Sequence, residues 1–318
     1  MTTRADLTTE SPLSSRLIAW MHERFPLENA VLFVVLYAAA VAFGRALVTE
    51  GTVTLGALDA VCFLAAWCFF LMLRVFDEHK DYELDCHNHP DRVLQSGLVT
   101  LGHLKVLGVF AIATQIGLSL WRDGGLGPIT LVWAVVMTWS ALMAVEFFCG
   151  EWLERRLVLY ALSHMLVMPM ALVWMAQMGA GATPLPLEVG ALAGLSFLSG
   201  AAFEVTRKLR APEDERDTVD SYTRVLGTTT APLVVMVLLT LGTGVLALAL
   251  NVITEVGPVY YAVLVAAMLP ALWALQGFRS APSAKAVKTC EGMVALCMLA
   301  GYVVLLVAIG LDRGFGCQ

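Results

Sequence analysis

Nine stretches of predominantly apolar residues fill most of this chain, and they restrict its fold more than any other feature. A helix needs about 20 such residues to cross the hydrocarbon core of a bilayer. Inside the bilayer the backbone N–H and C=O groups must bond to one another, so segments of this length are helical. We therefore predict an all-α, polytopic membrane protein of about nine helices. The predicted spans are 29–48, 56–76, 101–121, 126–147, 157–178, 185–203, 230–251, 257–277 and 287–311.

The composition argues against a soluble domain. Hydrophobic residues make up 58% of the 318 residues and charged residues 14%, whereas charged residues are about 25% of an ordinary soluble domain. We therefore expect the protein to lie in a lipid bilayer. The formal net charge of −6 offers no basis for binding nucleic acid, and no nucleic-acid partner is expected. In a membrane protein the distribution of charge between loops carries more information than the sum.

The basic residues indicate how the chain is oriented, because Lys and Arg concentrate on the cytoplasmic side of membrane proteins. With the N-terminus in the cytoplasm, only Arg45, Arg122 and Arg313 of the 20 Lys and Arg residues fall on the other side. A wrong number of spans would mix the two sides, so we predict a cytoplasmic N-terminus and an extracytoplasmic C-terminus. The predicted parts are a cytoplasmic N-terminal segment (1–28), a single transmembrane domain (29–311) and an extracytoplasmic tail (312–318).

The first of two charged cytoplasmic segments, 74–97, carries acidic residues at helical spacing. Asp77, Asp81 and Asp85 lie on one face if the second predicted helix continues past residue 76, with Glu78 beside them. Carboxylates stacked this way repel one another unless solvent screens them or cations lie among them. Mg²⁺ binds one or two protein carboxylates together with phosphate oxygens. The pattern therefore predicts Mg²⁺ ligands facing a diphosphate, and a solvated acidic helix end is the alternative.

Basic residues accompany these carboxylates in the same segment. Arg74 precedes the acidic residues by about one turn, Lys80 lies among them and Arg92 follows them. Arginine can bind phosphate oxygens through two parallel hydrogen bonds while metal ions bridge other oxygens. We therefore predict that Arg74, Lys80 and Arg92 contact the diphosphate.

The order and spacing of these residues resemble the first motif of the UbiA superfamily of intramembrane prenyltransferases. The family pattern is Arg-x-x-Asn-Asp-x-x-Asp-x-x-x-Asp followed by Arg-Pro-Leu-Pro-Ser-Gly. The matching segments here are Arg74-x-x-Asp77-Glu78-x-x-Asp81-x-x-x-Asp85 and Arg92-Val-Leu-Gln-Ser-Gly97. The resemblance implies nine helices around a central cavity, with loops that cap the cavity on the cytoplasmic side.

The same resemblance implies roles for individual residues. Mg²⁺ is the implied cofactor and an isoprenoid diphosphate the implied substrate, with catalytic roles for Arg74, Asp77, Asp81 and Asp85. Asp77 stands where the family usually has Asn, and Glu78 stands where it has Asp. Both changes keep or add an oxygen ligand, so metal binding is expected to survive them.

The second charged segment, 204–227, departs further from the family. Glu204 is positioned as the first acidic ligand and as a catalytic residue, but Arg207 and Lys208 occupy the turn where a further Asp is expected. We interpret these two cations as direct contacts to the diphosphate that replace part of a metal shell. The metal ligands that would complete this segment are, without a choice among them, Glu213, Asp214 and Asp217.

Three functions fit these features. The first is a Mg²⁺-dependent prenyltransferase that ionises an isoprenoid diphosphate and transfers the prenyl group to a hydrophobic acceptor, such as an aromatic compound, a quinone precursor or a lipid alcohol. The second is a UbiA-type terpene cyclase, in which the double bonds of the substrate capture the cation. The third is a transporter or structural membrane protein. We rank the transferase first because it is the commoner member of the family.

Two ionisable residues lie within predicted spans, where such residues are costly and often functional. Glu146 and His164 both lie near cytoplasmic helix ends. We interpret Glu146 as solvated at the membrane interface. His164, about two turns into its helix, is a candidate contact to an acceptor.

Overall fold

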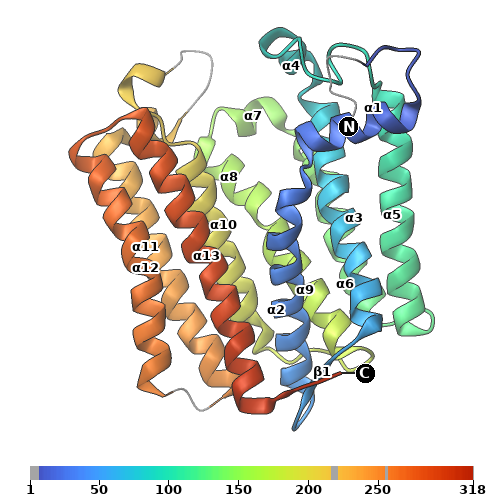
Figure 1. The fold of residues 1–318 in the computed structure, drawn as a ribbon, viewed down its shortest axis with the longest axis vertical. Coiled ribbons are helices and arrows are strands. Elements are labelled where there is room, and N and C mark those ends of the chain that lie inside the picture. The colour runs from blue at the N-terminus through green and yellow to red at the C-terminus, as the bar shows by residue number, and fades with distance from the viewer. Residues whose placement is uncertain (1–6, 216–220, 255–256, 318) are drawn as a thin grey trace.

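Long helices make up most of the computed structural model, which describes residues 7–215, 221–254 and 257–317. They run between two ends of the molecule and are joined by short connections (Figure 1). In the described residues eight helical segments are long and apolar enough to cross a bilayer, and α6 is a shorter apolar helix of 17 residues. The prediction of an all-α, polytopic membrane protein is confirmed. In chain order the segments are α2 (Ala30–Val48), α3 (Ala57–Lys80), α5 (Leu101–Asp123), α6 (Pro128–Ala144), α8 with α9 (Leu157–Met165 and Val167–Ala180), α10 (Val189–Arg207), α11 (Tyr222–Ile253), α12 (Pro258–Ser280) and α13 (Ala284–Arg313).

Several helices differ from their predicted bounds for identifiable reasons. The span predicted at 157–178 is two helices because Pro169 has no N–H to bond to Met165 and its ring crowds that carbonyl group. Helix α11 begins at Tyr222 because the Ser221 hydroxyl accepts the backbone N–H of Arg224 at 2.9 Å. Gly227 then interrupts the helix with a φ of +86°, a conformation that favours glycine.

Close backbone packing joins the last turns of α2 and α9, toward the end of the molecule opposite the charged segments. A methyl group added at Gly44 would overlap the carbonyl oxygen of Ala176, and one added at Gly179 would overlap that of Val41. Small residues allow helices to approach this closely, and dispersion contacts then stabilise the pair in a bilayer. This pair belongs to the larger of two hydrophobic cores, which also contains buried residues of α3 and α5.

The end of the molecule opposite the charged motifs is closed by a small sheet and an ion pair. Strands β1 (Val53–Leu55) and β2 (Phe315–Cys317) pair in parallel, with Val53 opposite Phe315. The Arg45 guanidinium binds both carboxylate oxygens of Asp59, at 2.8 and 3.0 Å. Most of the segment predicted as a tail is therefore ordered against the connection between α2 and α3.

The N-terminal segment contains an amphipathic helix that the sequence analysis did not predict. Helix α1 (Leu13–Arg24) lies across the end of the molecule that carries the α3–α5 connection (Figure 1). Its Trp20 side chain is fully buried, and Arg16 donates a 2.9 Å hydrogen bond to the carbonyl oxygen of Leu98. The remaining short helices are η2 (Leu27–Asn29), α4 (Tyr82–Asn88), η3 (Glu146–Phe148), α7 (Gly150–Glu154) and η4 (Pro212–Asp214).

Candidate functional site

Both charged segments lie at the same end of the helical bundle. Helix α4 and the end of α3 stand beside α1, and η4 follows the end of α10 across the same surface (Figure 1). Between the end of α3 and the end of α10 the chain crosses the bundle an even number of times, so it returns to the same end. The two segments therefore meet despite their separation in sequence. The described site residues of both segments therefore lie at one end of the bundle.

The first segment keeps its helical register through a change of helix. Helix α3 continues past residue 76, the condition on which the shared face of the aspartates depended, and ends at Lys80, while α4 begins at Tyr82. The backbone N–H of Asp81 bonds to the carbonyl oxygen of Asp77, and that of Asp85 bonds to Asp81, at 2.9 and 2.8 Å. The predicted four-residue spacing is thus present as a continuous line of backbone hydrogen bonds.

Glu78 is the most deeply buried charged side chain of this segment. It has no exposed surface, and its Oε1 atom accepts hydrogen bonds from Arg24 at 2.5 Å and from Arg74 at 2.6 Å. Charged hydrogen-bond partners of this kind offset the cost of burying a carboxylate. Its Oε2 atom is buried and has no hydrogen-bond partner among the described residues. Arg24, on α1, is a site residue that the sequence analysis missed.

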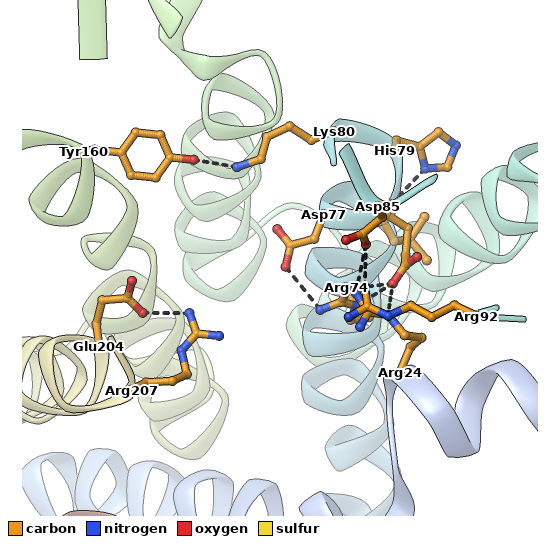
Figure 2. A network of polar contacts seen from close by, with 12 residues as sticks. Arg24, Arg74, Asp77, His79, Lys80, Asp85, Arg92, Tyr160, Glu204 and Arg207 are labelled. Atoms are coloured by element: carbon orange, nitrogen blue, oxygen red, sulfur yellow. Dashed lines mark hydrogen bonds and ion pairs between the residues drawn. The ribbon is translucent and has the colours of Figure 1, made fainter. Parts of the chain in front are cut away.

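The three aspartates differ in how far they are neutralised. The Asp85 carboxylate accepts a 2.7 Å hydrogen bond from Arg92 and lies 3.5 Å from Arg24 (Figure 2). Asp77 is 54% exposed and its nearest cation is Arg74, at 3.9 Å. Within the described residues Asp81 forms no ion pair, and burial raises the pKa of its carboxyl group above the usual value, against the opposing effect of Lys80.

Lys80 points away from the aspartates and into a second polar network. Its Nζ atom donates to the Tyr160 hydroxyl at 2.6 Å (Figure 2) and lies 2.9 Å from Oε1 of Glu146. The Tyr160 hydroxyl donates to the same Glu146 oxygen at 3.0 Å. The His164 ring stacks on the Tyr160 ring at 4.1 Å, and its Nε2 atom lies 3.5 Å from Oε2 of Glu146. Glu146 is therefore a network member rather than only a solvated interfacial residue.

A turn with unusual backbone geometry brings Glu146 into this network. Glu146, Phe147 and Phe148 have φ values of 49°, 53° and 57°, in the left-handed region that non-glycine residues rarely occupy. Three such residues in succession store backbone strain, which persists only where the surroundings hold it. The turn directs Glu146 inward while Phe148 remains 84% exposed. No sequence signal marks this turn, because none of the three residues is one that favours it.

The second segment brings two cations onto one carboxylate. The Glu204 side chain is 15% exposed and lies 2.8 Å from Arg207 (Figure 2). It also lies 2.8 Å from Lys208. The Lys208 Nζ atom lies 6.0 Å from the centre of the Tyr160 ring, and the Lys80 Nζ atom lies 5.3 Å from it. Lysines from both segments therefore approach the same tyrosine.

The acidic residues of η4 lie apart from this group. Glu213 and Asp214 are exposed and line a shallow hollow with the first turns of α13. Glu215 accepts hydrogen bonds from the Ser221 and Thr223 hydroxyls at 2.6 and 2.7 Å, so it fastens the start of α11. Asp217, the third predicted ligand of this stretch, lies outside the described residues.

The carboxylates of the first segment are compatible with Mg²⁺, although the described residues contain no group of three or more His, Cys, Asp or Glu side chains arranged to hold a metal ion. Mg²⁺ in phosphate sites uses only one or two carboxylates and takes its other ligands from phosphate and water. The Oε2 atom of Glu78, which has no hydrogen-bond partner in the described residues, and the carboxylates of the weakly paired Asp77 and of Asp81 are oxygens of that kind. Metal binding by these residues stays a prediction.

Comparison with known proteins gives one family and two similar structures. The model of the UbiA prenyltransferase family matches residues 31–298. A structure of digeranylgeranylglyceryl phosphate synthase is similar with a TM-score of 0.63 and 15% identity, over 93% of this chain and 99% of that one. The apo structure of a UbiA homologue from Aeropyrum pernix K1 is similar with a TM-score of 0.60 and 14% identity, over 87% of this chain and 97% of that one. At these identities the likeness concerns the fold. No curated protein matches the chain.

Proposed function

This chain belongs to the UbiA prenyltransferase family, and from that premise we propose that it is a Mg²⁺-dependent intramembrane prenyltransferase. The proposed substrates are an isoprenoid diphosphate and a hydrophobic acceptor, both dissolved in or bound at the bilayer. The observation that carries the proposal is the meeting of two charged segments at one end of an apolar helical bundle, where an amphiphile can place its head and tail.

The proposed reaction begins with loss of the diphosphate. The C1–O bond of the substrate breaks, its electron pair leaves with the diphosphate, and an allylic cation remains. The acceptor then forms a bond to C1 and releases a proton. When bound, Mg²⁺ supplies positive charge that stabilises the departing diphosphate.

The residues of this chain have distinct proposed tasks. Asp77, Asp81 and Glu204 hold metal ions, and Glu78 and Asp85 take part through oxygens that their arginine partners leave available. The half-exposed guanidinium of Arg207 and the side chains of Arg74 and Arg92 contact the diphosphate. Lys80 of the first segment and Lys208 of the second, whose ammonium groups both approach the Tyr160 ring, do so as well. For Glu213, Asp214 and Asp217 the metal role remains a prediction with no supporting contact in the described residues.

The proposed orientation follows from charge. With the N-terminus in the cytoplasm, the end that carries α1, α4 and η4 faces the cytoplasm and receives nearly all basic residues. A water-soluble diphosphate head then approaches from the compartment in which the site lies.

The test is incubation of the purified protein with Mg²⁺ and farnesyl or geranylgeranyl diphosphate, with and without candidate acceptors, followed by mass spectrometry of an organic extract. We expect a prenylated product that requires Mg²⁺ and falls at least about a hundredfold in Asp81→Asn. Glu188→Gln, an exposed carboxylate just before α10 at the opposite end, is the matched control and should retain activity. Cyclic or hydrocarbon products formed without an acceptor would replace the transferase by a cyclase. Absence of Mg²⁺-dependent binding of the diphosphate would refute both.

A further inference from the structure

Helix α1 places an arginine among the carboxylates of the first charged segment. The Arg24 Nε atom lies 2.5 Å from Oε1 of Glu78, and its Nη2 atom lies 3.5 Å from Oδ2 of Asp85. Figure 2 shows Arg24 reaching this group from α1, whereas Arg74 lies on α3 and Arg92 lies in the loop that follows α4. Only 16% of the Arg24 side chain is exposed. A protein cation thus touches two of the residues that we assign to metal ions.

The position of Arg24 is fixed by contacts that do not involve those carboxylates. The Glu23 side chain accepts the backbone N–H of Val93 at 3.2 Å, and Arg16 donates to the carbonyl oxygen of Leu98 at 2.9 Å. Trp20 is fully buried between these anchors. Helix α1 is therefore docked on the loop that follows α4, and the docking holds Arg24 against the carboxylates.

A divalent cation and Arg24 would compete for the same carboxylates, Glu78 and Asp85. In the described residues three arginines, Arg24, Arg74 and Arg92, pair with three of the four carboxylates, and Asp81 has no ion-pair partner, while Lys80 is engaged with Glu146. A divalent cation on Glu78 and Asp85 would place two further positive charges beside the Arg24 guanidinium. Like charges that close, and partly shielded from water, repel strongly.

We propose that Arg24 is the counterion of Glu78 and Asp85 in the metal-free protein, and that it leaves these carboxylates when they bind a divalent cation. Arg24 is then a positioning residue: it balances the charge of these two carboxylates and holds them in place until the metal arrives. Because Arg24 lies in the last turn of α1, its release loosens the contact of α1 with the site. The inference rests on the proposed function, since it requires metal binding at this segment.

The test is a titration of the purified protein with Mn²⁺, used as a paramagnetic substitute for Mg²⁺, in the absence of diphosphate. Free and bound Mn²⁺ are measured by electron paramagnetic resonance. Arg24→Gln removes the competing charge, so we expect it to bind Mn²⁺ about tenfold more tightly than the unaltered protein, a size typical of energetic coupling between two sites. Arg24→Lys keeps the charge and should bind Mn²⁺ about as the unaltered protein does.

Arg16→Gln is the matched control because it weakens the docking of the same helix without touching a carboxylate. If it tightens Mn²⁺ binding as much as Arg24→Gln, mobility of α1 explains the effect and the proposed competition is wrong. Equal or weaker Mn²⁺ binding by Arg24→Gln also overturns the proposal.

A second measurement on the unaltered protein remains decisive if Arg24→Gln does not fold. We expect the amides of residues 13–24 to exchange hydrogen faster after addition of Mg²⁺ and inorganic pyrophosphate. Unchanged exchange in α1, with pyrophosphate demonstrably bound, overturns the displacement of Arg24 but leaves the proposed function standing. Failure of the unaltered protein to bind either Mn²⁺ or Mg²⁺ with pyrophosphate refutes the proposed function itself.

Discussion

At the scale of single residues, Tyr160 connects the two charged segments. Its hydroxyl exchanges hydrogen bonds with Lys80 and Glu146, and its ring lies under the Lys208 ammonium group and against His164. Removal of the hydroxyl alone would leave a lysine and a carboxylate with fewer partners in a site that is mostly shielded from water. Such losses cost more than the hydrogen bond itself, because the remaining groups stay desolvated.

Tyr160→Phe is therefore expected to lower the free energy of unfolding by about 1 to 3 kcal/mol. The measurement is the thermal unfolding midpoint in detergent. Tyr261→Phe is the matched control, since among the described residues the Tyr261 hydroxyl bonds only to exposed Asn251 and its loss should cost less than about 0.5 kcal/mol. Equal shifts for the two variants would contradict the assignment of Tyr160 as a connecting residue.

At the scale of elements, the contact between α2 and α9 depends on the absence of side chains. Gly44 and Gly179 each face a carbonyl oxygen of the partner helix, so neither helix can move closer or accept a larger residue without separating. Because α9 continues from α8, this contact also fixes the position along the bundle axis at which Tyr160 and His164 lie beside the end of α3. Packing in the bundle interior thereby supports the geometry at its charged end.

Gly44→Ala should destabilise the protein by about 1 to 3 kcal/mol or more, because the added methyl group overlaps backbone atoms that cannot move away. Gly244→Ala, in α11 where nothing lies within 4 Å of the new methyl group, should instead be neutral or stabilise by up to about 1 kcal/mol. Thermal unfolding in the same detergent compares the two. A Gly44→Ala protein as stable as Gly244→Ala would rule out the close approach of α2 and α9.

At the scale of the whole molecule, the two ends of the helical bundle carry different sets of polar contacts. One end gathers carboxylates, arginines and lysines from α1, α3, α4 and α10. The other is closed by the β1–β2 sheet and by Arg45, which joins Asp59 to the carbonyl oxygen of Gly179. The proposed orientation assigns the first end to the cytoplasm.

This orientation predicts which thiols a membrane-impermeant maleimide can reach. In single-cysteine variants, exposed Cys149 should react in inverted vesicles and not in intact cells. A cysteine introduced as Glu188→Cys, on the α9–α10 connection, should show the opposite pattern. Reaction of both positions from the same side would overturn the predicted arrangement of spans, and reversed reactivity would overturn the assignment of sides.

The sequence by itself determined the class of fold and the four-residue spacing of the aspartates in the first motif, because both depend on local spacing. A run of apolar residues reports a helical span wherever it occurs, and carboxylates four residues apart share a helix face in any fold. The resemblance to the UbiA family was readable for the same reason, and the family comparison confirms it.

Only the tertiary structure decided which distant groups meet these motifs. Arg24 is 54 residues from Glu78, and Tyr160 is 80 residues from Lys80, so no periodicity could have paired them. Helix α1 was missed because its polar face is typical of a solvated segment, while the burial of Trp20 depends on the loop beneath it. Spacing along the chain specifies faces of helices, whereas partners across the site exist only after the helices have packed.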